Sequence, residues 1–280
     1  MRWSNVIRGF FMGITEMLPG ISSGTLMLLL GIYDQMLVSI NQLFTKKYKE
    51  SLKFLVPLVI GMGIAIVTMS SVINYMLNEH ATITHFFFLG LVLGVVPMMF
   101  KLGNYKVEFK SIHYILMIIV TIALFSLDYF VGEKASVENV QITGTLLIWM
   151  FISGFLGASA LILPGLSGAV ILLMLGAYPI VMYSISEFLS FDFSVFPVLM
   201  ATGLGVLSGV LLTSRILHYL LKTYPYLMYA LIIGLLIGSV FPIYNGMPSS
   251  ISEWVFSTVT FLLGLSISYY MSIKNNTHAI

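Results

Sequence analysis

The chain has 280 residues, of which 59% are hydrophobic and 9% are charged, with 13 Lys and Arg against 11 Asp and Glu. An ordinary globular domain carries roughly 25% charged residues. This composition therefore excludes a soluble enzyme, a nucleic-acid binder and a disordered chain. Cysteine is absent, which also excludes disulfides and thiolate chemistry. Because a crossing helix needs about 20 apolar residues, the composition predicts an all-α polytopic membrane protein.

Eight apolar segments follow one another along the chain, and a Pro-Gly pair interrupts two of them. The interrupted segments are 5–40, broken at Pro19-Gly20, and 142–185, broken at Pro164-Gly165. Proline and glycine stop a membrane helix, so each is predicted to form a broken hairpin that returns to the side it entered from. The first arm, about 14 residues or roughly 21 Å long, is too short for a hydrocarbon core of ~30 Å. This favours a re-entrant hairpin, and symmetry extends the prediction to the second. The other six segments are each predicted to cross once: 54–77, 85–100, 112–131, 195–221, 226–244 and 254–273.

Basic residues gather in alternate loops of this arrangement. All but one of the 13 lie at the N-terminus, in loops 46–53 and 101–110, around 215–222 or in the C-terminal tail, and Lys134 is the exception. Cytoplasmic loops of membrane proteins carry an excess of Lys and Arg. The charges therefore predict that both termini are cytoplasmic.

The two halves of the sequence repeat each other, which predicts a first unit at 1–140 and a second at 141–280. Each unit holds one hairpin and three crossings, and because three is odd the second unit must be inserted upside down. That inverted-topology repeat is typical of secondary transporters, whose binding sites lie at interrupted helices. Three motifs of the first hairpin recur 145 residues later. Gly9-Phe10 recurs as Gly154-Phe155, Leu18-Pro19-Gly20-Ile21-Ser22 as Leu163-Pro164-Gly165-Leu166-Ser167, and Gly31-Ile32-Tyr33 as Gly176-Ala177-Tyr178. Farther along the chain, Gly61-x-Gly63 is paired with Gly203-x-Gly205, and Gly90-x-x-x-Gly94 with Gly234-x-x-x-Gly238.

The residues after each Pro-Gly pair predict an anion site. A serine, Ser22 or Ser167, is placed to cap the next half-helix, whose free N–H groups and positive dipole end suit a phosphate. A single Pro-Gly pair is ordinarily a kink, but two equivalent copies favour a site shared by both hairpins. The residues that adjoin the serines in this predicted site are Pro19, Gly20, Ser23, Gly24, Thr25, Pro164, Gly165 and Gly168.

Three ionisable residues in apolar segments add to the predicted site. Arg8 and Glu16 lie in the first hairpin and Arg215 lies in the sixth apolar segment. Buried charges are costly in a membrane and mark functional positions. The two arginines are expected to offset a phosphate charge, and Glu16 to titrate and couple protons to its release. The alternative is that both arginines only reach toward the interface.

At these motifs the chain resembles the bacterial polyprenyl-phosphate transporter family of the PopT type. The resemblance rests on Pro19 to Thr25 with Gly31-Ile32-Tyr33, and on Leu163 to Gly168 with Gly176-Ala177-Tyr178, and covers essentially the whole chain. Ser23 departs from the family pattern, in which glycine is usual. The resemblance implies a plasma-membrane flippase that returns undecaprenyl phosphate to the inner leaflet for cell-wall synthesis.

Two other functions stay open at this point. A carrier of a small soluble anion would need a closed pocket instead of a laterally open groove. An intramembrane lipid phosphatase or phosphotransferase would need a dense cluster of Arg, His and Asp near a nucleophile, which neither hairpin offers. The five scattered histidines lack zinc-site spacing. We expect no catalytic residue, no metal and no cofactor; the expected partners are the lipid, the membrane and a coupling ion such as a proton.

Overall fold

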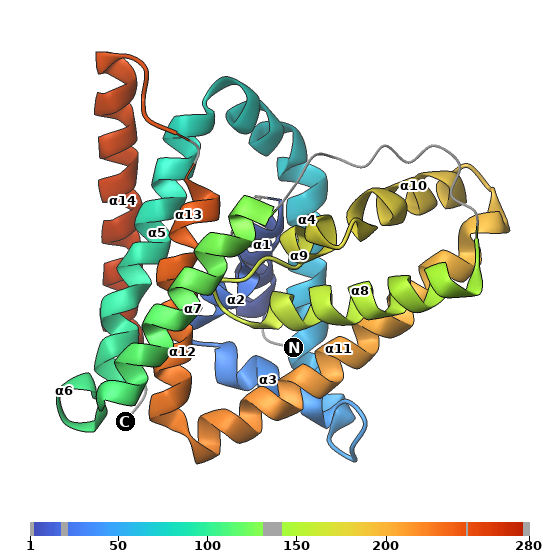
Figure 1. Ribbon diagram of the computed structural model, residues 1–280, viewed down its shortest axis with the longest axis horizontal. Coiled ribbons are helices and arrows are strands. Elements are labelled where there is room, and N and C mark those ends of the chain that lie inside the picture. Colours follow the sequence, from blue (N-terminus) through green and yellow to red (C-terminus); the bar gives the residue numbers. More distant parts are fainter. Residues whose placement is uncertain (1–2, 18–21, 131–141, 245, 277–280) are drawn as a thin grey trace.

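The computed structural model describes residues 3–17, 22–130, 142–244 and 246–276, and helices account for most of them (Figure 1). The helices of the first half are α1 (Ser4–Glu16), α2 (Ser23–Leu29), α3 (Tyr33–Gln42), α4 (Tyr48–Glu79), α5 (Ala81–Leu102), α6 (Tyr105–Glu108) and α7 (Ser111–Phe130). Those of the second half are α8 (Gly144–Ile162), α9 (Gly168–Met174), α10 (Ala177–Leu189), the 3-10 turn η1 (Phe193–Val195), α11 (Phe196–Thr223), α12 (Pro225–Gly238), α13 (Val240–Ile243) and α14 (Ile251–Asn276).

Within the described residues, six helical segments are long and apolar enough to cross a membrane, and two further pairs of short helices are sharply bent. This confirms the predicted all-α membrane protein with six crossing-length helices and two broken segments. The six are not all those predicted. Helix α8, the first arm of the second hairpin, also qualifies, with 19 residues, and α7, which covers 112–130 of the predicted segment 112–131, is a helix of 20 residues. The two hairpins therefore have unequal first arms, because α1 has only 13 residues.

Each hairpin contains a second break that the sequence interpretation missed. Helices α2 and α3 meet at 116°, and α9 and α10 meet at 104°. Gly31 and Gly176 lie at these bends, both with φ of +65°. Glycine tolerates this left-handed conformation because it has no Cβ. The Gly-x-Tyr motif that follows each Pro-Gly pair thus marks the end of a seven-residue half-helix.

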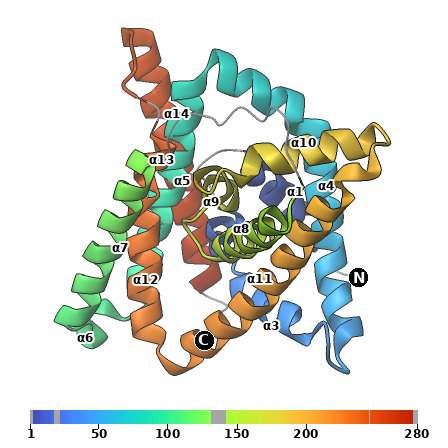
Figure 2. The same ribbon diagram turned by 45° about the vertical axis from the view of Figure 1, so that its right-hand side comes forward.

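Helix pairing follows one pattern in both halves (Figures 1 and 2). Helix α1 packs on α4, and α8 packs on α11 in the same way. The remaining long helices pair across the halves, α5 with α14 and α12 with α7. Both kinds of pair depend on glycines that let two backbones approach closely.

Equivalent glycines meet equivalent partners in these pairs. A Cβ on Gly61 would overlap the carbonyl of Val6, and one on Gly205 would overlap that of Phe151. The same relation holds for Gly90 against Phe261 and for Gly234 against Met117. The structure therefore aligns Gly61 with Gly205. The sequence alignment had paired Gly61 with Gly203, and Gly63 and Gly203 would both place a Cβ in open space.

The loops sort to two ends of the molecule. The α3–α4 loop, α6 and the junction of α11 with α12 lie at the bottom of Figure 1, and Figure 2 shows them at the same level. The junction of α4 with α5 and the start of α14 lie at the top in both views. The loops rich in lysine are thus at one end, as the charge pattern predicts.

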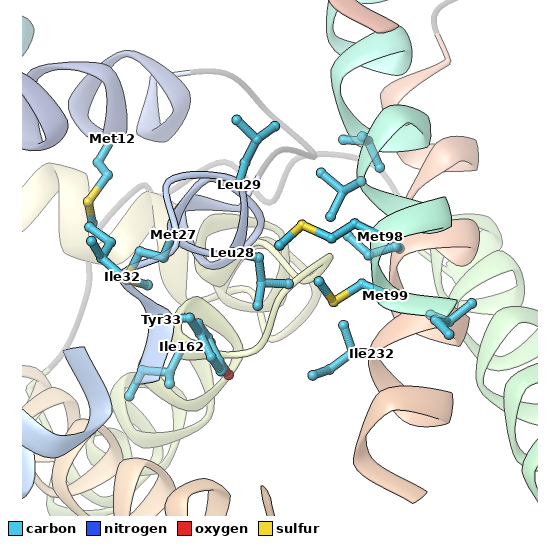
Figure 3. Close-up of a cluster of buried hydrophobic side chains, with 14 of the residues drawn as sticks. Met12, Met27, Leu28, Leu29, Ile32, Tyr33, Met98, Met99, Ile162 and Ile232 are labelled. Atoms are coloured by element: carbon cyan, nitrogen blue, oxygen red, sulfur yellow. The ribbon is translucent and has the colours of Figure 1, made fainter. Parts of the chain in front are cut away.

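Helix α2 lies in the middle of the molecule in both ribbon views (Figures 1 and 2), and Figure 3 shows the apolar side chains around it. Its Leu28 faces Met98 and Met99 of α5, and all three side chains are buried. Close packing of apolar side chains on several sides fixes the half-helix in place, although seven residues would not hold a helix by themselves. The polar start of α2 is therefore positioned by an apolar core.

Candidate functional site

The two broken hairpins touch where α2 begins. The Ser22 hydroxyl donates a hydrogen bond of 3.1 Å to the carbonyl oxygen of Leu163, the residue before Pro164. In the opposite direction, the backbone N–H of Gly165 donates to the Thr25 hydroxyl over 3.0 Å. Ser22 is 1% exposed and Thr25 is 5% exposed, and the Gly165–Thr25 contact is fully buried while the Ser22–Leu163 contact is partly buried. The start of the first hairpin's half-helix thus pairs directly with the second hairpin's Pro-Gly turn.

A third hydrogen bond and one close approach complete this contact. The Tyr33 hydroxyl donates to the carbonyl oxygen of Ile162 over 3.1 Å, and Figure 3 shows the side chains of these two residues next to each other. A Cβ on Gly24 would lie 3.0 Å from the nitrogen of Pro164 and 3.1 Å from the Ile162 oxygen. A larger residue at position 24 would therefore require the two hairpins to shift apart by a few tenths of an ångström.

The second turn exposes its backbone for a local reason. Leu163 has an extended conformation with ψ of 126°, as expected of a residue before proline. Gly165 follows with φ of +83°, and a Cβ there would lie 2.6 Å from the backbone of Leu235 in α12. Gly168 lies equally close to α8, since its Cβ would be 2.6 Å from the Gly157 oxygen. The turn is held between helices of its own half, and the carbonyls of Ile162 and Leu163 accept hydrogen bonds from the first hairpin.

The two predicted capping serines behave differently. Ser22 is the N-cap of α2, and its side chain accepts a hydrogen bond of 3.1 Å from the Gly24 N–H. This confirms the prediction for the first copy. Ser167 occupies the N-cap position of α9, but its side chain accepts no capping hydrogen bond. The predicted cap at Ser167 is therefore wrong, although its place at the helix start is right.

Glu16 lies where an external anion was predicted to bind. Its carboxylate Oε1 accepts a hydrogen bond of 3.2 Å from the backbone N–H of Ser23, at the start of α2. Glu16 has no oppositely charged partner at helix spacing on α1, and its carboxylate instead bonds to the backbone at the start of the next half-helix. The protein's own carboxylate occupies one of the N–H groups that a phosphate would use.

The two arginines are in different environments. Arg8 is partly buried, and its Nη1 donates to the side-chain oxygen of Asn5 over 3.0 Å. Asn5 is itself fully buried and donates to the carbonyl of Phe54 in α4. Arg215 is exposed on α11, and nothing joins it to Arg8 or Glu16 among the residues that the structure describes. The neighbouring Ser214 instead links α11 to α3 through two hydrogen bonds with Asn41 of 3.1 and 3.3 Å.

The outcome for the predicted site is therefore mixed. The structure brings Ser22, Thr25 and Gly165 together, along with the closely packed Gly24 and Pro164. It separates Ser167 and Arg215 from those contacts. Pro19 and Gly20 lie outside the described residues. The sequence interpretation missed Tyr33 as a contact between the hairpins; its signal was the repeated Gly-x-Tyr motif, whose role needs the bend at Gly31.

Fold and site together define a polytopic α-helical membrane protein in which two broken hairpins, one from each half, meet at a buried polar contact. A model of the undecaprenyl phosphate translocase-like family matches residues 12–259. The chain belongs to that family.

Two curated relatives agree with this assignment. The chain is similar to a polyprenyl-phosphate transporter of Staphylococcus aureus, with 40% identity over 95% of both chains. It is also similar to a polyprenyl-phosphate transporter of Vibrio cholerae, with 30% identity over 84% of this chain and 75% of that protein. Both relatives are named as transporters and not as enzymes, in agreement with the expectation that this chain is no enzyme. No solved structure matches the chain significantly.

Proposed function

We propose that this protein is a flippase that returns undecaprenyl phosphate across the bacterial plasma membrane for reuse in cell-envelope synthesis. The names of its relatives in Staphylococcus aureus and Vibrio cholerae support the lipid. The observation that supports the site is the buried polar contact between the two hairpins. Non-helical backbone inside a membrane is tolerated only within protein or beside a polar path, and such a path is what a phosphate headgroup requires.

The phosphate takes the place of contacts that the hairpins now make with each other. The Ser22 hydroxyl and the Gly165 N–H both point into the contact, where they bond to Leu163 and Thr25. When the hairpins separate, these donors are free to bind phosphate oxygens. Glu16 gains a proton and leaves the Ser23 N–H as the anion arrives, because two negative charges cannot share one helix start. This step couples transport to protons.

The proposed architecture is an inverted repeat of 1–140 and 141–280 with both termini cytoplasmic. The repeated glycine contacts support two equivalent halves, and the placement of the basic loops at one end supports the orientation. Reporter fusions at Lys47 and Lys106 test it, and we expect them to be cytoplasmic. Fusions at Glu133 and Asp192 should be external. Reversal of any two of these positions would exclude the inverted repeat.

Transport itself is tested in two systems. In cells depleted of the protein, undecaprenyl phosphate should accumulate on the outer surface. In vesicles that contain the purified protein, polyprenyl phosphate added to one leaflet should become accessible in the other faster than in protein-free vesicles. Equal rates with and without the protein would contradict the proposed function.

The ionisable residues are tested in the same vesicles. Gln at position 8 or 215 keeps hydrogen bonding but removes the charge, so Arg8→Gln and Arg215→Gln should insert normally and transport more slowly. Glu16→Gln keeps the acceptor for Ser23 and should remove the pH dependence of the rate. If all three well-inserted variants transport normally across pH, these charges have only interfacial roles.

A further inference from the structure

An apolar groove of about 430 Å³ lies between α1, α2, α5 and α14. Its walls include Ile7, Phe11, Leu26 and Ile267, and Arg8 is the one charged residue among those that line it. Three of the lining side chains face outward, with exposed fractions of 63% for Ile7, 50% for Phe11 and 45% for Ile267. The groove is therefore open to the surrounding bilayer along α1 and α14.

The groove leads from Arg8 to the contact between the hairpins. Its α1 wall runs from Ile7 to Thr15, a rise of roughly 12 Å along the helix. At Thr15 a smaller hollow continues inward and reaches Thr25. Thr25 is the residue whose hydroxyl accepts from the Gly165 N–H in the second hairpin. One end of the groove thus carries a cation and the other ends at the candidate site.

The chemistry of the lining selects the class of ligand. Arg8 has five N–H donors, and the described residues use one of them, in the hydrogen bond to Asn5. The hydroxyl of Thr15 donates to its own helix at Met12, over 2.8 Å. Beyond Arg8, the walls therefore offer almost nothing to a soluble anion. An amphiphile with an anionic head and an apolar chain matches both the charged end and the apolar walls.

The size and lining of the groove suit a single hydrocarbon chain, since its volume is about 430 Å³ and its walls are apolar beyond Arg8. The volume is in the range of small-molecule sites, roughly 300–1,000 Å³.

We infer that this groove binds the isoprenoid chain of polyprenyl phosphate, in the units next to its phosphate, with the phosphate at Arg8. The inference rests on the proposed function, which supplies the lipid. The groove then holds the lipid at one end of its path, with the head at Arg8 and the chain directed toward Thr15 and Thr25.

Photo-crosslinking of the purified full-length protein tests the groove directly. The probe is a polyprenyl phosphate with a diazirine in the isoprene units nearest the phosphate. We expect crosslinked peptides from α1, α2, α5 and α14, and competition by unlabelled polyprenyl phosphate. Inorganic phosphate and a phosphatidate with ordinary acyl chains should not compete at equal concentration. Equal competition by phosphatidate would overturn the assignment to an isoprenoid chain.

A matched pair of variants separates the groove from the general lipid surface. Ile267→Trp fills the groove, whereas Leu262→Trp changes the same helix outside it; the exposed fractions are 45% and 53%, so both should fold. We expect Ile267→Trp to weaken probe binding about tenfold, a change of about 1.4 kcal/mol, and Leu262→Trp to bind like the wild type. Arg8→Gln should weaken binding of the phosphate probe but not that of the uncharged polyprenol.

The vesicle assay keeps this inference distinct from the proposed function. If the wild type transports but Ile267→Trp and Leu262→Trp bind and transport alike, the groove inference is overturned and the function stands. If the wild type fails to transport while the probe still labels the groove, the proposed function fails and the binding site stands.

Discussion

The first and second hairpins share a backbone design but differ in chemistry. Both have a half-helix of seven residues that ends at a glycine with φ of +65°. At their contact, the first hairpin supplies the side chains of Ser22, Thr25 and Tyr33. In the hydrogen bonds among the described residues of this contact, the second hairpin supplies main-chain groups only. A repeat of this kind can thus keep its geometry in both copies while one copy alone carries the polar side chains.

The positions equivalent to these side chains explain the difference. Val170 stands 145 residues after Thr25, and Leu161 stands 145 residues after Glu16. Neither offers a polar group, so the second half-helix has no carboxylate at its start. The second hairpin therefore contributes backbone groups to the contact, and the first hairpin contributes the side chains that bond to them.

The largest effect should come from the packing that the two halves share. Gly61→Ala places a methyl group on the Val6 carbonyl and should destabilise the protein by about 3 kcal/mol. Gly63→Ala faces open space and should stabilise it by up to about 1 kcal/mol, since alanine is the better helix former. Unfolding in mixed detergent micelles measures both. In the second half, Gly205→Ala is the equivalent of Gly61→Ala and should destabilise the protein similarly, and Gly203→Ala, which also faces open space, is its control. If Gly205→Ala is tolerated, the halves are not equivalent.

A smaller effect should distinguish the two hairpins chemically. Thr25→Val keeps the shape of the side chain but leaves the buried Gly165 N–H without its acceptor, which should cost about 2 kcal/mol. Val170→Thr is the control at the equivalent position of the second hairpin and should change stability little. The same unfolding measurement applies. A large loss with the control would mean that both half-helices depend equally on their third residue.

The bends should respond equally in both copies. Gly31→Ala and Gly176→Ala each force a Cβ into the left-handed region, at a cost of about 1–2 kcal/mol. No neighbour lies within 4 Å of a Cβ at Gly176, so the loss of stability in Gly176→Ala should come from backbone strain. Gly176→Asn should recover part of the loss because asparagine tolerates this conformation better. No loss in the alanine variants would show that the bends do not need glycine.

The smallest effect should come from the two tyrosines of the Gly-x-Tyr motifs. Tyr33→Phe removes the hydrogen bond to the Ile162 carbonyl and should cost about 1 kcal/mol. Tyr178→Phe is the matched control, since the Tyr178 hydroxyl has no hydrogen-bond partner among the described residues. Thermal unfolding in detergent can compare the two. Equal losses would remove the distinction between the hairpins at this position.

The sequence by itself determined the class of the protein, its helical segments and its repeat. Apolar segments of about 20 residues and Pro-Gly interruptions are local properties. Inside a membrane the apolar segments must form helices, and the Pro-Gly pairs must interrupt them. The Pro164-Gly165 turn and the cap at Ser22 were predictable for this reason. Local signals also located the Gly-x-Tyr motifs, although not what they do.

Only the tertiary structure decided which groups meet. Pairing of Ser22 with Leu163 joins residues 141 positions apart, and nothing in local helix spacing specifies it. The same holds for Glu16, whose partner became the Ser23 N–H because α2 folds back against α1. The correction of the Gly61 equivalent from Gly203 to Gly205 has a similar cause. Each Gly-x-Gly motif contains two glycines, and only the contact of one of them with α1 or α8 shows which is equivalent to which. Contacts between distant helices depend on how whole surfaces pack, and that information is spread over the entire chain.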